Sequence, residues 1–173
     1  MTEEADPDRS ETDRPATDRS DRLLLDAMLG KLTTYLRMCG YDAAYVLEGD
    51  GGERDSDPGD GEIAATVRTS DRTLLTRDGD LAARVDDAVR LESKDVREQL
   101  EELRDAGYDL SLSDRPSRCA ACNGELRAVD ADEPLPSYAP DPSETDCWRC
   151  RDCGQIFWKG SHWDDVRETL GEL

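Results

Sequence analysis

Between residues 22 and 112, the spacing of the hydrophobic residues along the chain changes several times. Short apolar runs alternate with longer segments in which apolar residues recur every three or four positions. The short runs predict buried strands, and these cover residues 23–25, 43–47, 73–76 and 88–91. The spaced segments predict amphipathic helices, and these cover residues 28–39, 62–69, 81–85 and 96–106. Strands that alternate with helices predict an α/β fold with three layers and a mostly parallel sheet.

The two ends of the chain differ from this central part. Residues 1–21 contain almost no apolar side chain, which predicts a disordered acidic tail. Residues 113–117 ("SDRPS") have the composition of a linker. Beyond residue 117 lie five of the six cysteines, all three tryptophans and the only histidine. We therefore expect an α/β domain over residues 22–112 and a small second domain over residues 113–173.

Acidic residues follow two of the predicted strands. Asp26 directly follows the first strand, and Asp78 follows the third, with Asp80 two residues later. Asp60 and Glu62 begin the helix that precedes the third strand. Ligands of parallel sheets collect at the carboxyl ends of strands, and closely packed carboxylates need a cation to offset their repulsion. The pattern predicts a Mg²⁺ or Mn²⁺ site of the kind that hydrolyses phosphodiesters.

These aspartates also have a second interpretation. Aspartate is a favoured helix N-cap, and in a chain with 42 acidic residues any single aspartate is better explained as a cap. Asp26 and Asp78 fit the metal interpretation best, because each ends an apolar strand. Both interpretations stay open at this point.

Two Cys-x-x-Cys pairs, Cys119/Cys122 and Cys150/Cys153, predict a closed structural zinc site with four thiolate ligands. Glycine follows each pair closely and permits the turn that points both sulfurs the same way. Cys147 and Cys150 also have the pair spacing, although Gly154 favours Cys150 with Cys153. Disulfides and a rubredoxin-like iron site are weaker alternatives in a reducing compartment.

The only histidine, His162, has the chemistry to replace a cysteine ligand, but its neighbours indicate the start of a helix. Ser161 and Asp164 have the spacing of a capping box for a helix that runs from Trp163. We therefore expect Ser161 to be the N-cap of that helix.

The net charge changes what can be inferred about partners. The chain has 42 acidic and 22 basic residues, a net charge of −20, and only three lysines. A basic stripe is the usual footprint of nucleic-acid binding, so this acidity alone disfavours a polyanion. In molar salt, however, the Debye length is about 3 Å and a carboxylate-rich surface keeps a protein soluble. We therefore expect a halophilic protein.

No apolar segment approaches the ~18–20 residues that a membrane helix needs, and the N-terminus has no signal-peptide core. The expected location is the cytoplasm, with no membrane partner.

Three stretches together resemble the Mut7-C family, in which a PIN-like ribonuclease domain is followed by a zinc ribbon. They are "LLLDAMLGKLTTYLRMCGYD", "GDGEIAATVRTSDRTLLTRDGDLA" and "CRDCGQIFWKGSHW". The resemblance covers residues 22–167 and implies a PIN-like domain over residues 22–112. It also favours Cys150 and Cys153 as zinc ligands and leaves Cys147 free.

The resemblance further implies roles for single residues. Asp26, Asp78 and one of Asp60 or Glu62 are implied to hold Mg²⁺ or Mn²⁺, with Asp80 as a fourth acid.

Lys31 and Arg37 match basic positions of the first helix in the family, and contact with RNA phosphates is implied for both. Ordinary charge on the helix surface is the alternative role, and for Arg37 the two are equally balanced.

Two hypotheses for function follow. The first is a metal-dependent endoribonuclease that cleaves single-stranded RNA, with a structural zinc ribbon. The second is a non-catalytic adaptor whose ribbon binds RNA or protein partners. Asp26, Asp78 and Asp80 favour the first hypothesis, and the acidity favours the second.

Overall fold

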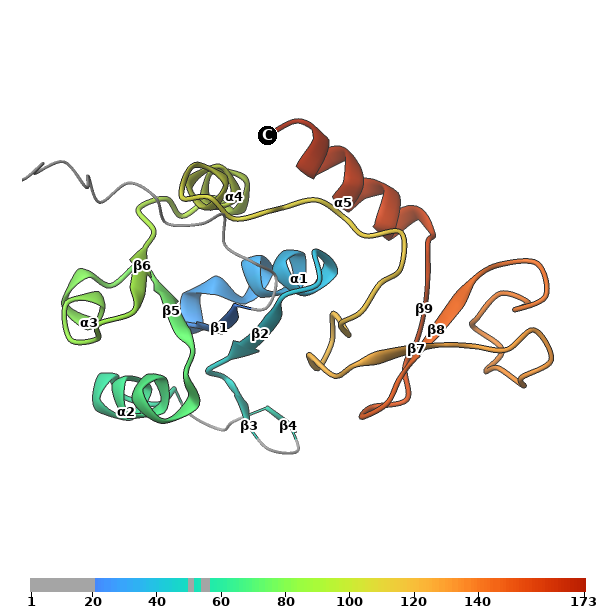
Figure 1. Cartoon of the computed structure of the whole chain (residues 1–173), viewed down its shortest axis with the longest axis horizontal. Coiled ribbons are helices and arrows are strands. Elements are labelled where there is room, and N and C mark those ends of the chain that lie inside the picture. Colours follow the sequence, from blue (N-terminus) through green and yellow to red (C-terminus); the bar gives the residue numbers. More distant parts are fainter. Residues whose placement is uncertain (1–20, 50–51, 54–56) are drawn as a thin grey trace, which may run out of the picture.

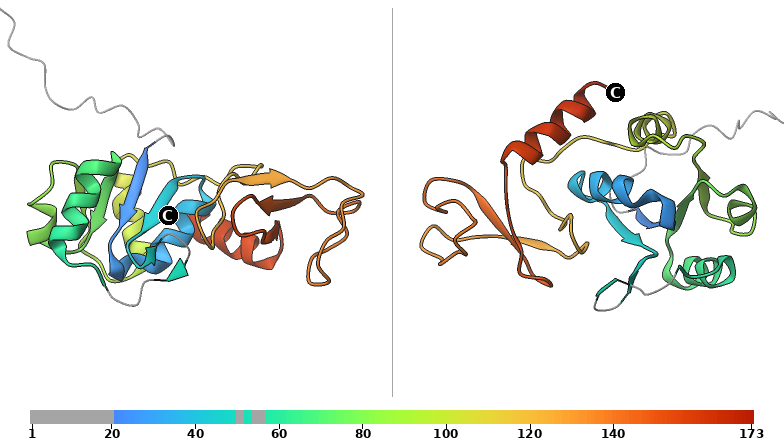
Figure 2. Two further views of the ribbon diagram at one scale, coloured as in Figure 1. Left: turned by 90° about the horizontal axis from the view of Figure 1, so that it is seen from below. Right: turned by 180° about the vertical axis from the view of Figure 1, so that it is seen from behind.

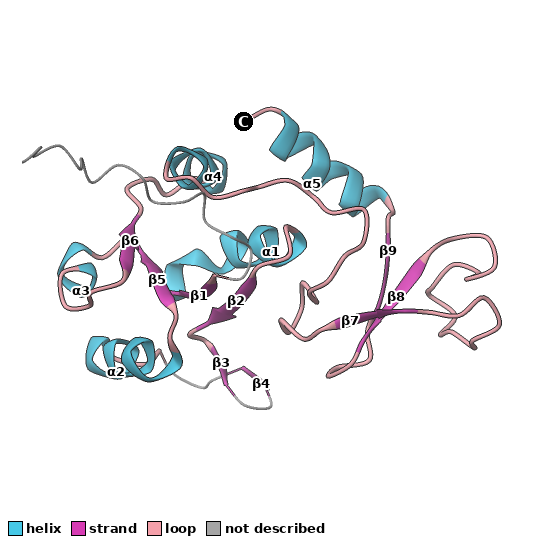
Figure 3. Cartoon of the chain, viewed as in Figure 1, coloured by secondary structure: helices cyan, strands magenta, loops and turns pink. Residues whose placement is uncertain are grey.

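A computed structural model of the chain describes residues 21–49, 52–53 and 57–173. The tail predicted for residues 1–21 lies outside this range, apart from Asp21. Figure 1 shows an α/β unit followed by a smaller β-sheet unit, and Figure 3 shows the same view coloured by secondary structure.

Four parallel strands form the larger sheet, in the order β2-β1-β5-β6. They are β1 Arg22–Leu25, β2 Asp42–Tyr45, β5 Thr73–Thr76 and β6 Ala88–Arg90. Two-residue strands β3 and β4, Glu48–Gly49 and Gly52–Glu53, pair with each other beside this sheet.

The helices of this unit are α1 Gly30–Met38, α2 Asp60–Ser70, α3 Gly79–Ala82 and α4 Val96–Asp105. A short 3₁₀ turn, η1 Ala27–Leu29, precedes α1. All the predicted strands and helices are present. The helix expected at residues 81–85 is α3, which begins earlier because the Asp78 carboxylate accepts hydrogen bonds from the backbone of its first turn.

Side chains alternate across the sheet, so each central strand contributes to two hydrophobic layers. Leu23 and Leu25 pack with residues of α1 and α4, whereas Leu24 packs on the other face with residues of α2 and α3. Because both faces of β1 are covered, its sequence is apolar throughout rather than alternating. The predicted α/β class, with a parallel sheet between two helical layers, is confirmed (Figure 1).

The C-terminal part forms a small antiparallel sheet in the order β7-β8-β9. Its strands are β7 Leu126–Ala128, β8 Cys147–Cys150 and β9 Ile156–Trp158, and helix α5 Ser161–Gly171 follows. Figure 2 shows this sheet beside the α/β unit, with α5 running back toward α1 and α4. Trp163 and Val166 of α5 pack on Met38 of α1. The last helix thus completes the packing of the first unit. The predicted domain boundary at residue 113 stays a prediction.

The prediction that Ser161 caps the last helix is wrong. Helix α5 begins at Ser161 itself, and its N-cap is Gly160, which forms no side-chain cap hydrogen bond. A Cβ atom at Gly160 would lie 2.8 Å from Nε1 of Trp158, so the indole leaves no room for a capping side chain.

Candidate functional site

The order of the strands places one crevice in the sheet. From β1 the chain moves to β2 on one side, and it then returns to β5 on the other side of β1. In open parallel sheets, ligands bind at such a switch point, outside the carboxyl ends of the two strands. Asp26 follows β1 and Asp78 follows β5, so both predicted carboxylates belong to this edge.

Asp26 is both a helix cap and an oriented acid. Its side chain is buried, with 7% of the residue exposed. Oδ1 accepts a hydrogen bond of 2.7 Å from the backbone N–H of Ala27, and Oδ2 accepts one of 2.7 Å from Oγ1 of Thr76. The two sequence interpretations are therefore compatible, because capping uses one oxygen and leaves lone pairs on both.

Thr76 joins the two strand ends. Its hydroxyl donates to Asp26 and accepts a hydrogen bond of 3.0 Å from the backbone N–H of Asp78. Oδ1 of Asp78 in turn accepts from the N–H groups of Asp80 and Leu81 and so begins α3. One fully buried hydroxyl thus fixes both carboxylate-bearing segments relative to each other.

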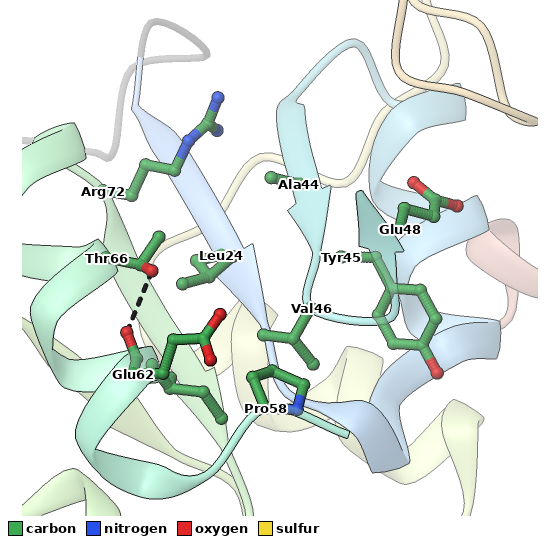
Figure 4. Close-up of a pocket in the computed structure, with 10 residues that line it drawn as sticks. Leu24, Ala44, Tyr45, Val46, Glu48, Pro58, Glu62, Thr66 and Arg72 are labelled. Carbon is green, nitrogen blue, oxygen red and sulfur yellow. Dashed lines mark hydrogen bonds between the residues drawn. The ribbon is translucent and has the colours of Figure 1, made fainter. Parts of the chain in front are cut away.

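The other predicted acids lie apart from this pair. Asp80 is exposed in the first turn of α3. Asp60 begins α2, and its carboxylate pairs with Arg84 at 3.7 Å. Glu62 lines a cavity of about 130 Å³ between β2 and α2, together with Val46 and Pro58. Figure 4 shows the Glu62 carboxylate directed into this cavity.

Within the described ranges, no three carboxylates lie close enough to enclose one ion, whereas the four cysteine sulfurs all lie within 4.8 Å of one another. This does not conflict with a magnesium site. Mg²⁺ keeps several waters and is commonly held by one or two carboxylates together with substrate phosphates. The pair Asp26 and Asp78 has the donor chemistry for such an ion.

The four predicted zinc ligands come together at the base of the small sheet. Cys119 Sγ and Cys153 Sγ are 3.7 Å apart, and Cys122 Sγ and Cys150 Sγ are 3.5 Å apart. A tetrahedron with Zn–S bonds of about 2.3 Å has edges of about 3.8 Å. All six cysteines are free thiols, so the sulfur geometry fits one zinc ion and not a disulfide.

The surroundings act differently on the cysteines of this site, because burial raises the pKa of Cys119 and Cys122 whereas the pKa of Cys150 is lowered. Burial raises the pKa of Cys150, but backbone N–H groups of Cys153 and Asp152 outweigh it and leave the pKa lowered. Cys147 is buried outside the cluster, and its sulfur donates a hydrogen bond to the carbonyl oxygen of Thr145. His162 is exposed in the first turn of α5 and is not among the clustered ligands.

The expectation that Arg37 lies on a polar helix surface, available to RNA, is wrong. Only 2% of Arg37 is exposed. Its guanidinium donates to the carbonyl oxygens of Ala43 in β2 and Ala120 in the cysteine loop, and it pairs with Glu48. The C-terminal unit covers this side of α1, which a single helix pattern does not reveal. Lys31, in contrast, is exposed at the start of α1.

Asn123, directly after Cys122 of the cysteine cluster, makes another contact between the two units. Its Oδ1 accepts a hydrogen bond of 2.9 Å from the N–H of Ala43, and its Nδ2 donates to Asp42 at 2.7 Å. Burial raises the pKa of Asp42, but hydrogen bonds from Arg72 and Asn123 outweigh it and lower the pKa to about 2. The cysteine loop is thus tied to the outer strand of the larger sheet.

Arg37→Met is expected to lower the free energy of unfolding by about 2–4 kcal/mol, because it leaves two carbonyl groups and Glu48 without their partner. Arg37→Lys should fall between Arg37→Met and the parent, since one ammonium cannot reproduce a planar fork. Urea unfolding followed by circular dichroism measures the change. Arg68→Met, on the exposed side of α2, is the control and should stay within about 0.5 kcal/mol of the parent. A parental value for Arg37→Met contradicts this role.

Sequence reasoning missed Thr76 and Asn123. Thr76 is the polar end of the apolar run "TLLT", and its position beside Asp26 depends on the pairing of β1 with β5. Asn123 has a backbone φ of 68°, which asparagine tolerates. Its position directly after Cys122 predicts only a turn and gives no sign of the contact with β2.

Together these features define an α/β protein with an acidic strand edge and a four-cysteine ribbon. The Mut7-C RNAse domain family model matches residues 21–170, which is most of the 173-residue chain, and the protein belongs to this family. The comparisons with curated proteins and with solved structures found no match. Among the described helices, none has the length and apolar character needed to cross a bilayer.

Proposed function

We propose that this protein is a metal-dependent endoribonuclease that hydrolyses phosphodiesters of single-stranded RNA. The observation that carries the proposal is the Asp26–Thr76–Asp78 arrangement at the switch point of the sheet. Membership of an RNAse domain family supports the choice of RNA as substrate.

Asp26 and Asp78 would hold Mg²⁺ or Mn²⁺, and exposed Asp80 would contact it through water. When bound, the cation polarises the phosphodiester and activates water for attack. Asp26 is held in one orientation by Ala27 and Thr76, which limits the reorganisation needed to bind an ion. Asp60 and Glu62 are left out of this centre, because Asp60 pairs with Arg84 and Glu62 faces the cavity beside β2.

The remaining parts have supporting roles in this proposal. Cys119, Cys122, Cys150 and Cys153 hold a structural zinc with no open coordination position. Lys31 is free to contact a phosphate because it is exposed at the start of α1. The net charge of −20 with three lysines fits a protein that works in a cytoplasm at high salt.

The direct test is a cleavage assay with labelled single-stranded RNA in molar KCl, using the zinc-loaded protein with Mn²⁺, with Mg²⁺ or with no added divalent cation. We expect cleavage with either metal and none without added metal. A parallel arm with single-stranded DNA of the same sequence tests the choice of RNA. If RNA binds but is not cleaved with either metal, the adaptor hypothesis replaces the nuclease.

Thr76→Val is expected to weaken Mn²⁺ affinity by about 10–100-fold, because the hydrogen bond from Thr76 holds the Asp26 carboxylate in one orientation for the ion. Valine has nearly the same shape but cannot donate to Asp26. Calorimetric titration with Mn²⁺ measures the affinity. Thr76→Ser keeps the hydroxyl and should restore most of it, whereas equal affinity in the valine and serine variants contradicts this positioning role.

A further inference from the structure

Arg77, between Thr76 and Asp78, has one guanidinium nitrogen without a hydrogen-bond partner. Within the part of the chain that the structure describes, its Nε is the one buried side-chain nitrogen or oxygen without a hydrogen-bond partner. Its Nη1 reaches only the sulfur of Met28, at 3.9 Å. Met28 lies in η1, the turn that Asp26 caps, and is 60% exposed. The guanidinium therefore lies over the turn that begins at the candidate metal edge.

This lack of partners is unusual in a chain with nearly twice as many acidic as basic residues. Nine of the fifteen arginines in the described ranges form an ion pair, Arg37, Arg72 and Arg84 among them. A thioether sulfur is a weak acceptor, and a buried unsatisfied donor is rare in native proteins. Such a donor needs an explanation, and a ligand bound at this edge of the sheet is one.

Arg90 approaches the same edge from the next strand. It ends β6 and pairs in register with Thr76 of β5. Its guanidinium packs against Gly79, where a Cβ atom would lie 3.2 Å from Cζ and 3.3 Å from Nε. Gly79 is the first residue of α3, directly after its cap Asp78. Glycine at this position thus leaves room for the Arg90 guanidinium beside the first turn of α3.

We propose that Arg77 and Arg90 bind a phosphate group of the nucleic-acid backbone at this edge. The inference rests on the proposed nuclease function and adds the groups that hold its substrate. Guanidinium groups match phosphate oxygens with two parallel hydrogen bonds, and two of them offset the repulsion between a polyanion and the carboxylates. Direct contacts of this kind also explain how so acidic a protein could bind RNA without a basic groove.

The test measures binding without cleavage. Anisotropy of a labelled single-stranded RNA is recorded with the zinc-loaded protein and no added Mg²⁺ or Mn²⁺, over KCl concentrations at which circular dichroism shows the fold intact. Arg77→Gln and Arg90→Gln should each weaken binding about tenfold or more. Each should also reduce the slope of log affinity against log salt by about 0.7, the value for one phosphate contact on a single strand. The control Arg167→Gln removes an equal charge from exposed α5 and should leave the slope unchanged.

Further variants keep the inference falsifiable if Arg77→Gln does not fold. Arg77→Lys should keep the parental slope with intermediate affinity, and Arg90→Gln tests the exposed partner independently. Mn²⁺ affinity should not fall in any of these variants. Parental slopes in both glutamine variants, or no RNA binding by the parent at the lowest salt that keeps it folded, overturn the inference. If the variants lose binding but the parent never cleaves RNA, the nuclease proposal fails and the phosphate contacts stand.

Discussion

The Asp26→Asn protein is expected to fold normally and to lose metal-dependent RNA cleavage by at least about a hundredfold. Asparagine is as good an N-cap as aspartate, so its side-chain oxygen can still accept from the N–H of Ala27. The hydroxyl of Thr76 can rotate to suit either side-chain amide group. The fold therefore loses little, while the charge that attracts the cation is removed.

Asp78→Asn should have the same effect, since it also keeps its cap and loses its charge. The matched control is Asp71→Asn, at the exposed end of α2, where the left-handed φ of 53° suits asparagine. Cleavage rates with Mn²⁺, together with calorimetric Mn²⁺ affinity, report the loss, and circular dichroism reports the fold. Parental cleavage by both the Asp26 and Asp78 variants would falsify the nuclease proposal.

Cys119→Ser is expected to abolish zinc binding and to unfold the β7-β8-β9 sheet. Structural zinc binding contributes on the order of 10 kcal/mol or more to folding, and this sheet has few buried apolar residues to replace it. Cys119 is also fully buried, so serine would leave a polar group without its metal partner.

Zinc content by atomic absorption and tryptophan fluorescence measure this effect, because all three tryptophans lie after residue 147. The control is Cys147→Ser, which should retain about one zinc per chain, since the Cys147 sulfur bonds to Thr145 and lies outside the cluster. Loss of zinc from the Cys147 variant would show that the wrong pair was assigned.

Local patterns were enough to predict the strands and most helix positions, and the four cysteines that the pattern and the family resemblance favoured lie in one cluster. An apolar run such as Leu23–Leu25 identifies a strand by itself. The Cys-x-x-Cys spacing by itself points two sulfurs to the same side of a turn. The two strand-end acids could also be predicted, because parallel strands bring their carboxyl ends together.

Long-range contacts were beyond such reasoning. Arg37 has a polar position in its own helix, yet a carbonyl group 83 residues later in the sequence helps to bury it. The direction of Glu62 depends on how α2 packs beside β2, which spacing along the helix does not determine. The role of Gly160 depends on the Trp158 indole, so the S-x-x-D pattern predicted the wrong cap.

The hydrogen bond between Asn123 and Ala43 has a consequence for solubility. Strand β2 is an outer strand of the sheet, and an uncovered outer strand offers its N–H and C=O groups as a template for another chain. The cysteine loop occupies this position in the native protein. Under zinc starvation the loop would therefore release β2 and expose the backbone N–H and C=O groups of this outer strand. The expected consequence is self-association of the protein through the exposed strand.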